Sequence, residues 1–323
     1  MANYLVTGAA GFIGARTTEM LIADGHTVVG VDNMNDAYDP RMKEFRLAHL
    51  QTLSGFTFKK LDISSRADVE QLQNYKFDAV INLAARAGVR FSVDNPWLFY
   101  ETNLTGTLNM LELCRTTGTK KFLLASTSSI YGANPPYPTS ETASSSEPLQ
   151  PYAASKKGAE VLAHSYHYLH GIDVSVVRYF TVYGPAGRPD LAMFRFCQWI
   201  NEGRPVRING DGNQSRGFTY VDDIARGTIL ALKPLGYEII NLGGHDVITI
   251  NDLVKMLEEL IGKKANVQYG PPNLADMYSN WADVSKAKEM LGWKPEVGLL
   301  EGVKKLVEWY AAEKSWANEV LTP

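Results

Sequence analysis

Near its N-terminus the chain reads Thr7-Gly8-Ala9-Ala10-Gly11-Phe12-Ile13-Gly14, and the short apolar run Tyr4–Thr7 leads directly into these residues. From Phe12 to about Ala23 the apolar residues recur with the period of an amphipathic helix. Glycines between a strand and a helix permit a tight turn, close approach of the backbone to an anion, and close packing of helix on strand. The amide groups at the start of such a helix hold a pyrophosphate. The stretch therefore predicts a dinucleotide-binding turn.

The second predicted strand, His26–Val31, ends in Asp32, about 20 residues beyond the glycines. A carboxylate at this place accepts hydrogen bonds from both adenosine-ribose hydroxyls and repels a 2′-phosphate, which favours NAD over NADP. The alternative is that Asp32 only caps a turn, and Asn33 beside it keeps this alternative open.

Strand and helix patterns alternate through the first half of the chain. This order predicts an α/β fold with a doubly wound parallel sheet, the Rossmann arrangement. Further strands are expected at Phe77–Leu83, Lys121–Ser126 and Val174–Phe180, and helices at Pro96–Thr117 and Pro151–His170.

After Gly184 the alternation weakens. We expect helices at Asp190–Gly203, Asn251–Ile261 and about Leu299–Glu319, a short strand at Val206–Asn209, a polar loop at Gly210–Arg216, and a strand at Tyr237–Leu242 that returns to the main sheet. The expected division is a dinucleotide-binding domain of residues 1–180, with 218–245 returning to it, and a smaller, discontinuous substrate-binding lobe of residues 181–217 and 246–323.

Composition narrows the class of protein. The chain has 323 residues, a formal net charge of -3 and no basic run, which argues against a nucleic-acid or membrane-surface partner. No signal peptide or membrane span is expected. Cys114 and Cys197 are interpreted as reduced packing residues of a cytoplasmic protein. The three histidines of the segment His164–His170 are interpreted as a helix surface or subunit contact, and no metal site is predicted.

The segment Tyr152-Ala-Ala-Ser-Lys156 carries the chemistry. On a helix this spacing places the phenol and the amine on one face. An ammonium nearby favours the phenolate, so we expect Lys156 to bring the pKa of Tyr152 toward the working range of a base. The same spacing occurs at Tyr310 and Lys314, in the expected last helix, where no other reactive group accompanies it.

A strand that ends in Ala125-Ser126-Thr127-Ser128-Ser129-Ile130-Tyr131-Gly132 precedes the Tyr152 helix. The carboxyl ends of strands in a doubly wound sheet open onto the ligand crevice, so these hydroxyls should face the phenol across a substrate. A serine-rich turn without a ligand is the simpler alternative.

These motifs resemble the extended short-chain dehydrogenase/reductases, and most closely the NAD-dependent UDP-sugar 4-epimerases. The matching pieces cover nearly the whole chain: TGAAGFIG, NLAARAGVR from Asn82, ASTSSIYG, YAASK, RYFTVYGP from Arg178, RGFTYVDD from Arg216 and NWADVSKA from Asn280. The resemblance implies a tightly bound NAD, a UDP-sugar substrate, and a homodimer paired through the helices Pro96–Thr117 and Pro151–His170.

The resemblance also implies the site residues. The catalytic set is Tyr152, Lys156 and Thr127, and Asp62 lies near the adenine. Cofactor contacts are expected from Gly8, Gly11, Phe12, Ile13, Gly14, Asp32, Asn33, Asp62, Ile63, Leu83, Ala84, Ala85, Asn103, Ser126, Tyr152, Lys156 and Tyr179. In the second lobe Arg216 is expected on phosphate and Asp276 on the uridine ribose. Asn273 stands where glucose-type epimerases often have a second arginine, and Arg90 or Arg195 is expected to replace that cation.

The residues after Thr127 distinguish between reactions that share oxidation at sugar carbon 4. Related dehydratases carry an Asp-Glu pair here, and related decarboxylases carry a glutamate at the second position. This chain has Ser128 and Ser129, whose hydroxyls are too weakly acidic to replace them. We therefore expect a 4-epimerase, and disfavour a UDP-glucuronate decarboxylase, a 4,6-dehydratase and a non-catalytic NAD-binding protein.

The sugar is assigned from a second group. Thr127, Ser128, Ser129, Thr181 and Arg188 would form a socket that suits a carboxylate on carbon 6, as in UDP-glucuronate 4-epimerases. UDP-glucose remains the alternative substrate, and a surface or interface salt bridge remains the alternative role for Arg188. We prefer the interconversion of UDP-glucuronate and UDP-galacturonate.

Overall fold

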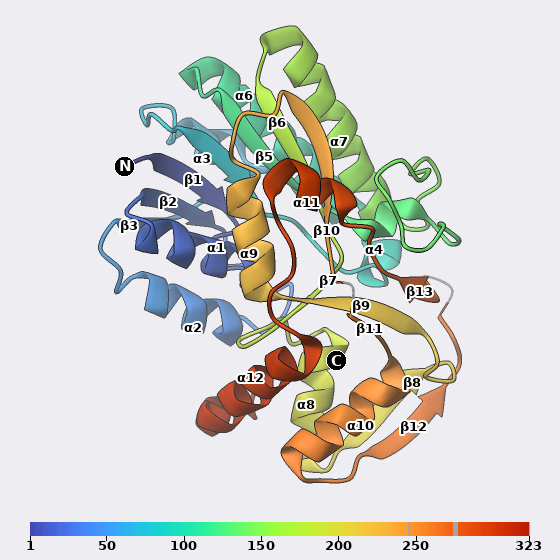
Figure 1. Ribbon diagram of the computed structural model, residues 1–323. Coiled ribbons are helices and arrows are strands. Elements are labelled where there is room, and N and C mark those ends of the chain that lie inside the picture. Colours follow the sequence, from blue (N-terminus) through green and yellow to red (C-terminus); the bar gives the residue numbers. More distant parts are fainter. Residues whose placement is uncertain (245, 274–276, 323) are drawn as a thin grey trace.

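A computed structural model describes residues 1–244, 246–273 and 277–322. Within these residues seven parallel strands form one sheet in the order β10-β6-β5-β4-β1-β2-β3 (Figure 1). The strands are β1 Asn3–Thr7, β2 Thr27–Asp32, β3 Phe56–Lys60, β4 Ala79–Asn82, β5 Lys121–Thr127, β6 Asp173–Tyr179 and β10 Tyr237–Leu242. Strand order reverses between β1 and β4, the point where ligands bind in open α/β sheets.

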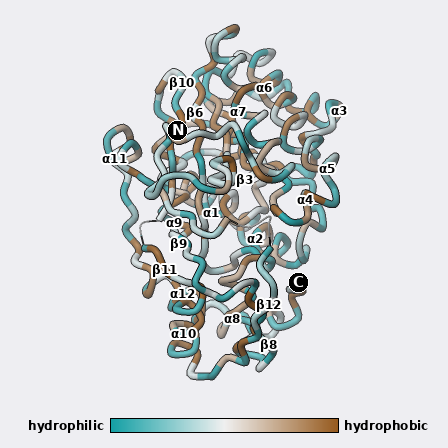
Figure 2. The backbone as a smooth tube through the Cα atoms, turned by 90° about the vertical axis from the view of Figure 1, so that its right-hand side faces the viewer, coloured by the Kyte–Doolittle hydropathy of each residue, from teal (hydrophilic) through white to brown (hydrophobic). Residues whose placement is uncertain are grey.

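Helices cover both faces of this sheet. Successive residues along a strand point to opposite faces, and in these strands the residues on both faces are largely apolar. Val6 packs in the cluster that includes Leu21 of α1 (Phe12–Ala23) and Ile224 of α9 (Val221–Leu230). Leu5 packs on the other face with α6 (Gly106–Thr117) and α7 (Pro151–His170). The smaller helices of this region are α2 Arg41–Leu50, α3 Arg66–Glu70, α4 Phe91–Asp94, α5 Pro96–Tyr100 and α11 Ser285–Leu291. In Figure 2 hydrophobic segments run through the middle of the molecule and hydrophilic ones through the outer loops.

The second lobe lies below the carboxyl end of the sheet in Figure 1. Its strands are β7 Thr181–Tyr183, β9 Ser215–Tyr220, β11 Asp246–Thr249 and β13 Ser279–Asn280 in one small sheet, and β8 Pro205–Asn209 with β12 Asn266–Gly270 in another. Its helices are α8 Ala192–Glu202, α10 Ile250–Ile261, α12 Leu299–Ala312 and α13 Lys314–Ala317. The cap of α10 is Thr249, whose hydroxyl accepts from the amide of Asp252, and Gly262 ends the helix in the left-handed region.

Several elements differ from the sequence expectation. The segment Pro96–Thr117 is interrupted by a π-helical turn, Glu101–Thr105. The last helix ends at Ala312, because Glu313 leaves the helical conformation and its carboxylate accepts from Trp316 Nε1 at 2.7 Å. Residues 218–220 belong to β9 in the second lobe's sheet, whereas β10 lies in the first sheet.

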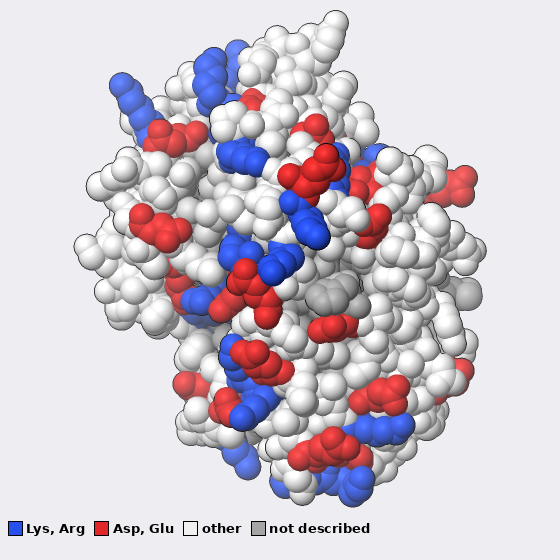
Figure 3. All heavy atoms as spheres, in the orientation of Figure 1, with Lys and Arg blue, Asp and Glu red and all other residues white. Residues whose placement is uncertain are grey.

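The patterns at α2, β3 and α9 were not identified from the sequence. Charged residues interrupt the apolar run of α2, and β3 is an edge strand with no fully buried residue, so neither shows a clear period. In the part of the chain that is described, no helix combines the length and apolar character that crossing a membrane requires. Acidic and basic side chains are mixed over the face in Figure 3.

Candidate active site

A cavity of about 950 Å³ lies at the carboxyl ends of β1, β4 and β5 and extends into the second lobe. Every described residue expected to bind cofactor or substrate lines it, except Asn103. Asp276 lies outside the described residues. The cavity therefore brings together groups that are more than 200 residues apart in the sequence.

The glycine turn presents bare backbone to this cavity. Gly8 has φ +69, and a Cβ added there would lie 2.8 Å from the amide nitrogen of Ala84. A Cβ on Gly14 would lie 2.1 Å from the carbonyl oxygen of Gly8. The N-cap of α1 is Gly11, which offers no side chain to the first amides of the helix. These features fit an anionic pyrophosphate held by main-chain N–H groups.

The carboxylate at the end of β2 has two partners. Asp32 accepts from the amide of Met34 at 2.8 Å and pairs with Lys43 Nζ at 3.3 Å. It thus caps a turn, as the alternative interpretation held, and also lines the cavity. Lys43, which lines the cavity too, was missed because a single lysine in a charged helix carries no distinctive sequence signal.

Asp62 lies across from this turn. Asn33 Nδ2 donates to its carboxylate at 2.8 Å, and Ser64 donates through both its amide and its hydroxyl. Burial acts to raise the pKa of Asp62, but the hydrogen bonds from Ser64 and Asn33 hold it below its ordinary value. The group is therefore an ionised acceptor at neutral pH.

Asn103 does not line the cavity, contrary to its predicted cofactor contact. It is fully buried in the π-helical turn, accepts from the amide of Arg86 at 2.8 Å and donates to the carbonyl of Arg86 at 2.9 Å. It also donates to Ser155 Oγ at 3.0 Å. The physical reason is that the hydrogen-bonding groups of the Asn103 amide are already used. They join the loop at Arg86 to Ser155, a residue of α7 between Tyr152 and Lys156.

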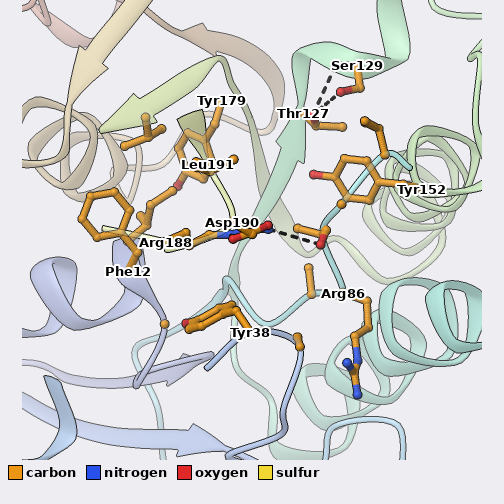
Figure 4. Close-up of a pocket in the computed structure, with 18 of the residues that line it drawn as sticks. Phe12, Tyr38, Arg86, Thr127, Ser129, Tyr152, Tyr179, Arg188, Asp190 and Leu191 are labelled. Atoms are coloured by element: carbon orange, nitrogen blue, oxygen red, sulfur yellow. Dashed lines mark hydrogen bonds and ion pairs between the residues drawn. The ribbon is translucent and has the colours of Figure 1, made fainter. Parts of the chain in front are cut away.

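Tyr152 and Lys156 both line the cavity, one turn apart on α7. The ring of Tyr152 lies near Thr127, with Arg188 farther across the cavity (Figure 4). Burial raises the pKa of Tyr152, while a hydrogen bond with Thr127 and the charge of Arg188 act to lower it. The charge of Arg188 thus acts on the phenol from a segment that the Tyr152–Lys156 spacing did not include.

Lys156 is buried, and burial lowers its pKa to about 8, against the opposing effect of the Glu160 carboxylate. Among the described residues its Nζ atom has no hydrogen-bond partner. A buried ammonium with unused donors is costly unless a ligand accepts from it. This orphaned group fits the ribose hydroxyls of a bound dinucleotide.

The second Tyr–Lys pair has no such setting. Tyr310 is fully buried in α12 and donates to Glu202 Oε1 at 3.4 Å, and Lys314 lies beyond the end of that helix. Neither residue lines the cavity. Context therefore separates the two pairs, as the sequence indicated.

The hydroxyl groups at the end of β5 and just after it line the same cavity. Thr127 Oγ1 donates to Ser129 Oγ at 3.2 Å, and Ser128 Oγ accepts from Asn280 Nδ2 at 2.8 Å. Ser126 donates to Glu160, a buried carboxylate that also forms a two-point ion pair with Arg178. Sequence reasoning missed Asn280 as a partner of Ser128 and Glu160 as a partner of Ser126, because each of these contacts spans more than 30 residues.

Arg188 is held in the cavity by an ion pair. Its Nε and Nη2 donate to the two carboxylate oxygens of Asp190 at 3.0 and 2.6 Å, and Nη2 donates to the carbonyl of Ala87 at 3.3 Å. The side chains of Arg188 and Asp190 are 21% and 23% exposed. The alternative interpretation, a salt bridge, is thus found, but it lies inside the cavity, across from Tyr152 (Figure 4).

Further cations line the cavity. Arg195 and Arg216 of the second lobe and Arg90 of the first were expected to, and Arg207 of the second lobe joins them. Arg216 donates to the carbonyl of Tyr278 at 2.9 Å, so β9 and the segment before β13 position it. The alternating pattern of β8 gave no reason to assign Arg207 to the cavity.

A doubly wound sheet with a bare glycine turn and a Tyr-x-x-x-Lys helix at its crevice defines the class of short-chain dehydrogenases/reductases. More specifically, the chain belongs to the NAD dependent epimerase/dehydratase family, whose model matches residues 4–243.

Relatives with assigned activities match over nearly the full length. The chain is 55% identical over 312 residues to a UDP-glucuronate 4-epimerase of Thermodesulfobacterium geofontis, covering 96% of each chain. The structure of the Bacillus cereus UDP-glucuronic acid 4-epimerase with UDP-glucuronic acid and NAD superposes with a TM-score of 0.91 at 36% identity, covering 96% of this chain and 99% of that one. A UDP-glucose 4-epimerase of Thermotoga maritima with UDP-glucose gives 0.89 at 33% identity, covering 97% and 99%.

Proposed function

We propose that this protein is an isomerase that interconverts UDP-glucuronate and UDP-galacturonate, using a tightly bound NAD and a transient 4-keto sugar. One observation carries the choice of reaction. A phenol that can take the carbon 4 proton lies in the same cavity as hydroxyls and a guanidinium suited to a carboxylate, and Ser128 and Ser129 stand where an acid would direct elimination.

Tyr152 is proposed as the base that removes the hydroxyl proton at carbon 4 and later returns it. Thr127 shares the hydrogen bond of that hydroxyl, and the adjacent charge of Arg188 favours the phenolate. Lys156 is proposed to donate to the nicotinamide ribose, because its buried ammonium has unused donors. With those donors satisfied, the ammonium adds a second positive charge near the phenol.

The dinucleotide is proposed to occupy the part of the cavity that the glycine turn and the ends of β2 and β3 line. Gly8, Gly11 and Gly14 would admit the pyrophosphate, Asp32 and Lys43 would meet the adenosine ribose, and Asp62 with Asn33 would meet the adenine. When bound, NAD supplies an acceptor for the carbon 4 hydride and gives the same hydride back.

The socket has a second task besides recognition. The 4-keto form of a glucuronate is a β-keto acid, and it loses carbon dioxide when the carboxylate charge moves into an enolate. Hydrogen bonds from Ser129 and Thr181, together with the charge of Arg188, would stabilise that charge where it starts. Each charged hydrogen bond contributes roughly 1.5–3 kcal/mol. We therefore attribute the retention of the carboxyl group to the same residues that recognise the carboxylate of the substrate.

UDP-glucose is the second candidate substrate, and one observation favours it. Arg188 already shares its charge with Asp190, which weakens its attraction for a second carboxylate. The uridine diphosphate of either sugar is proposed to lie near Arg216 and Arg195, with Arg90 facing the cavity from the nucleotide side.

Incubation of the NAD-loaded protein with UDP-glucuronate, UDP-glucose and UDP-N-acetylglucosamine tests the proposal. We expect UDP-galacturonate of unchanged mass from the first sugar. A product lighter by the mass of carbon dioxide would instead identify a decarboxylase. Removal of NAD should abolish turnover and its return should restore it; inversion by protein stripped of NAD would contradict the proposal.

We also propose a homodimer through α5, α6 and α7, which span Pro96–Thr117 and Pro151–His170, and a cytoplasmic location. Trp97 on α5 and Tyr168 on α7 are 80% and 81% exposed, and Leu169 is 68% exposed. Exposed apolar side chains on α5 and α7, two helices that pack against each other, support a covered face. Light scattering of the wild type and of Trp97→Ser tests the dimer: a monomeric wild type would contradict it.

The cytoplasmic location is supported by two separate buried thiols.

A further inference from the structure

Arg46 of α2 is a buried cation that does not line the cavity. All three of its guanidinium nitrogens donate to groups in other segments. Nε and Nη2 donate to the carbonyl of Ala186 at 2.9 and 2.7 Å, and Nη2 also donates to the carbonyl of Gly187 at 3.2 Å. Nη1 donates to the carbonyl of Ala10 at 3.1 Å and to the hydroxyl of Tyr38 at 2.9 Å.

The acceptors of Arg46 belong to two turns with different tasks. Ala10 lies in the glycine turn, where the pyrophosphate is expected. Ala186 and Gly187 directly precede Arg188, the cation of the sugar end. One side chain thus joins the main chain of both turns.

The turn at Ala186 is strained. Ala186 has φ 52, in the left-handed region that an alanine rarely adopts. Such a conformation persists when surrounding contacts over-determine it. Here two N–H groups of Arg46 hold the carbonyl of that residue.

Close packing reinforces this turn. A Cβ on Gly187 would lie 3.0 Å from the carbonyl oxygen of Gly184 and 3.8 Å from the ring of Phe12, so the sugar-side turn rests on the glycine turn. The ring of Phe12 also lies 5.8 Å from the Arg46 guanidinium carbon. In Figure 4 Arg188 extends from the neighbourhood of Phe12 toward the middle of the cavity.

We propose that Arg46 is a positioning residue for sugar selectivity: by holding the strained Ala186–Gly187 turn against the glycine turn, it fixes where Arg188 meets the substrate carboxylate. This inference rests on the proposed function, because selectivity is defined by UDP-glucuronate against UDP-glucose. A guanidinium is required, since the planar fork of arginine reaches several carbonyls at once and the single ammonium of lysine does not.

The test compares kcat and KM for both sugars in the NAD-loaded full chain. Arg46→Lys should lower the ratio of kcat/KM for UDP-glucuronate to that for UDP-glucose by about tenfold, because a charge-assisted multidentate contact is lost. Ala186→Gly removes the strain that Arg46 sustains and should lower the same ratio by about threefold, with the fold retained. Arg115→Lys is the matched control, since Arg115 makes a two-point contact with Glu112 on α6 and neither residue lines the cavity. Its ratio should not change.

An unchanged ratio in both Arg46→Lys and Ala186→Gly overturns the inference. If Arg46→Lys does not fold, Ala186→Gly alone decides. A wild type that binds NAD but turns over neither sugar defeats the proposed function. In that case the ratio of calorimetric Kd values for the two UDP-sugars, measured in the same variants, still tests the positioning role of Arg46.

Discussion

The two halves of the cavity are built in different ways. The nucleotide half uses main-chain groups of one contiguous segment, residues 8–14, supported by Asp32 and Asp62 at the ends of neighbouring strands. The proposed sugar half uses side chains from separate segments, such as Ser128, which accepts from Asn280, and Arg188, which donates to Asp190. Backbone recognition tolerates no added atom, whereas side-chain recognition can be retuned one residue at a time. The first half is therefore expected to fail as a unit, and the second to change its selectivity.

The largest expected effect is the loss of turnover when the proposed base is removed, because this change leaves both halves of the cavity intact. Tyr152→Phe removes the proposed base and leaves the glycine turn intact, so kcat should fall by at least about 10³-fold with NAD content unchanged. Bound NAD after gel filtration and turnover of UDP-glucuronate are the measurements. Tyr310→Phe is the matched control for a Tyr–Lys pair outside the cavity. Activity retained in Tyr152→Phe would refute the assignment of the base.

Gly14→Ala should disrupt the nucleotide half as a whole. The new methyl group would lie 2.1 Å from the carbonyl oxygen of Gly8, and overpacking of this kind typically costs about 1–3 kcal/mol or more. We expect a lower Tm and loss of copurified NAD. Gly298→Ala, where nothing lies within 4 Å of the added atom, serves as control. Normal NAD content in Gly14→Ala would show that the turn can yield.

Arg188→Ala tests the sugar half. Loss of one charged hydrogen-bonding group, about 1.5–3 kcal/mol, should reduce kcat/KM for UDP-glucuronate by roughly 10- to 150-fold. UDP-glucose turnover should fall much less, with NAD still bound. The control is Arg204→Ala, an arginine outside the cavity whose side chain is 45% exposed. Equal losses with both sugars would remove the carboxylate socket.

The smallest expected effect is a pH-dependent stability difference at the boundary of the halves. The pKa of Lys156 is lowered by burial to about 8, below the value of 10.5 for an unfolded lysine. Between these values the unfolded chain binds more protons than the folded one, so this group adds stability as pH rises through the window and subtracts it below pH 8. Without NAD, Lys156→Met should thus be more stable than the wild type at pH 7, by about 1–3 kcal/mol.

Denaturant unfolding of both NAD-free proteins from pH 7 to above 10 measures the difference in their free energies of unfolding. This difference should become smaller as the pH rises from about 8 to 10.5. A difference that stays constant over that range would show that the Lys156 ammonium is not destabilised by burial.

The sequence predicted the parts of the molecule that are coded locally. The glycine turn, Asp32 and the Tyr152 helix each lie within one short segment whose spacing reflects its geometry, and all were placed correctly in the cavity. Likewise the strand at Tyr237–Leu242 was identified by its apolar run.

Partners that act across the fold could not be predicted. Lys43, Asp190, Asn280 and Arg46 have no pattern of their own, because their roles depend on which loops the sheet order brings together. Asn103 was assigned to the cofactor from the family resemblance, although its amide is used by Arg86 and Ser155. The pKa of Tyr152 was predicted from its neighbour in sequence, whereas burial dominates it.

The seventh strand of the main sheet has a consequence for biosynthesis. Asn241 on β10 accepts from the hydroxyl of Tyr131 at 2.7 Å and donates to the carbonyl of Thr139 at 3.0 Å, so it braces the loop that follows the catalytic strand. A ribosome delivers that brace more than 100 residues after Tyr131. Nascent chains shorter than about 240 residues therefore lack the seventh strand, and the first sheet can be completed only after several segments of the second lobe have been synthesised.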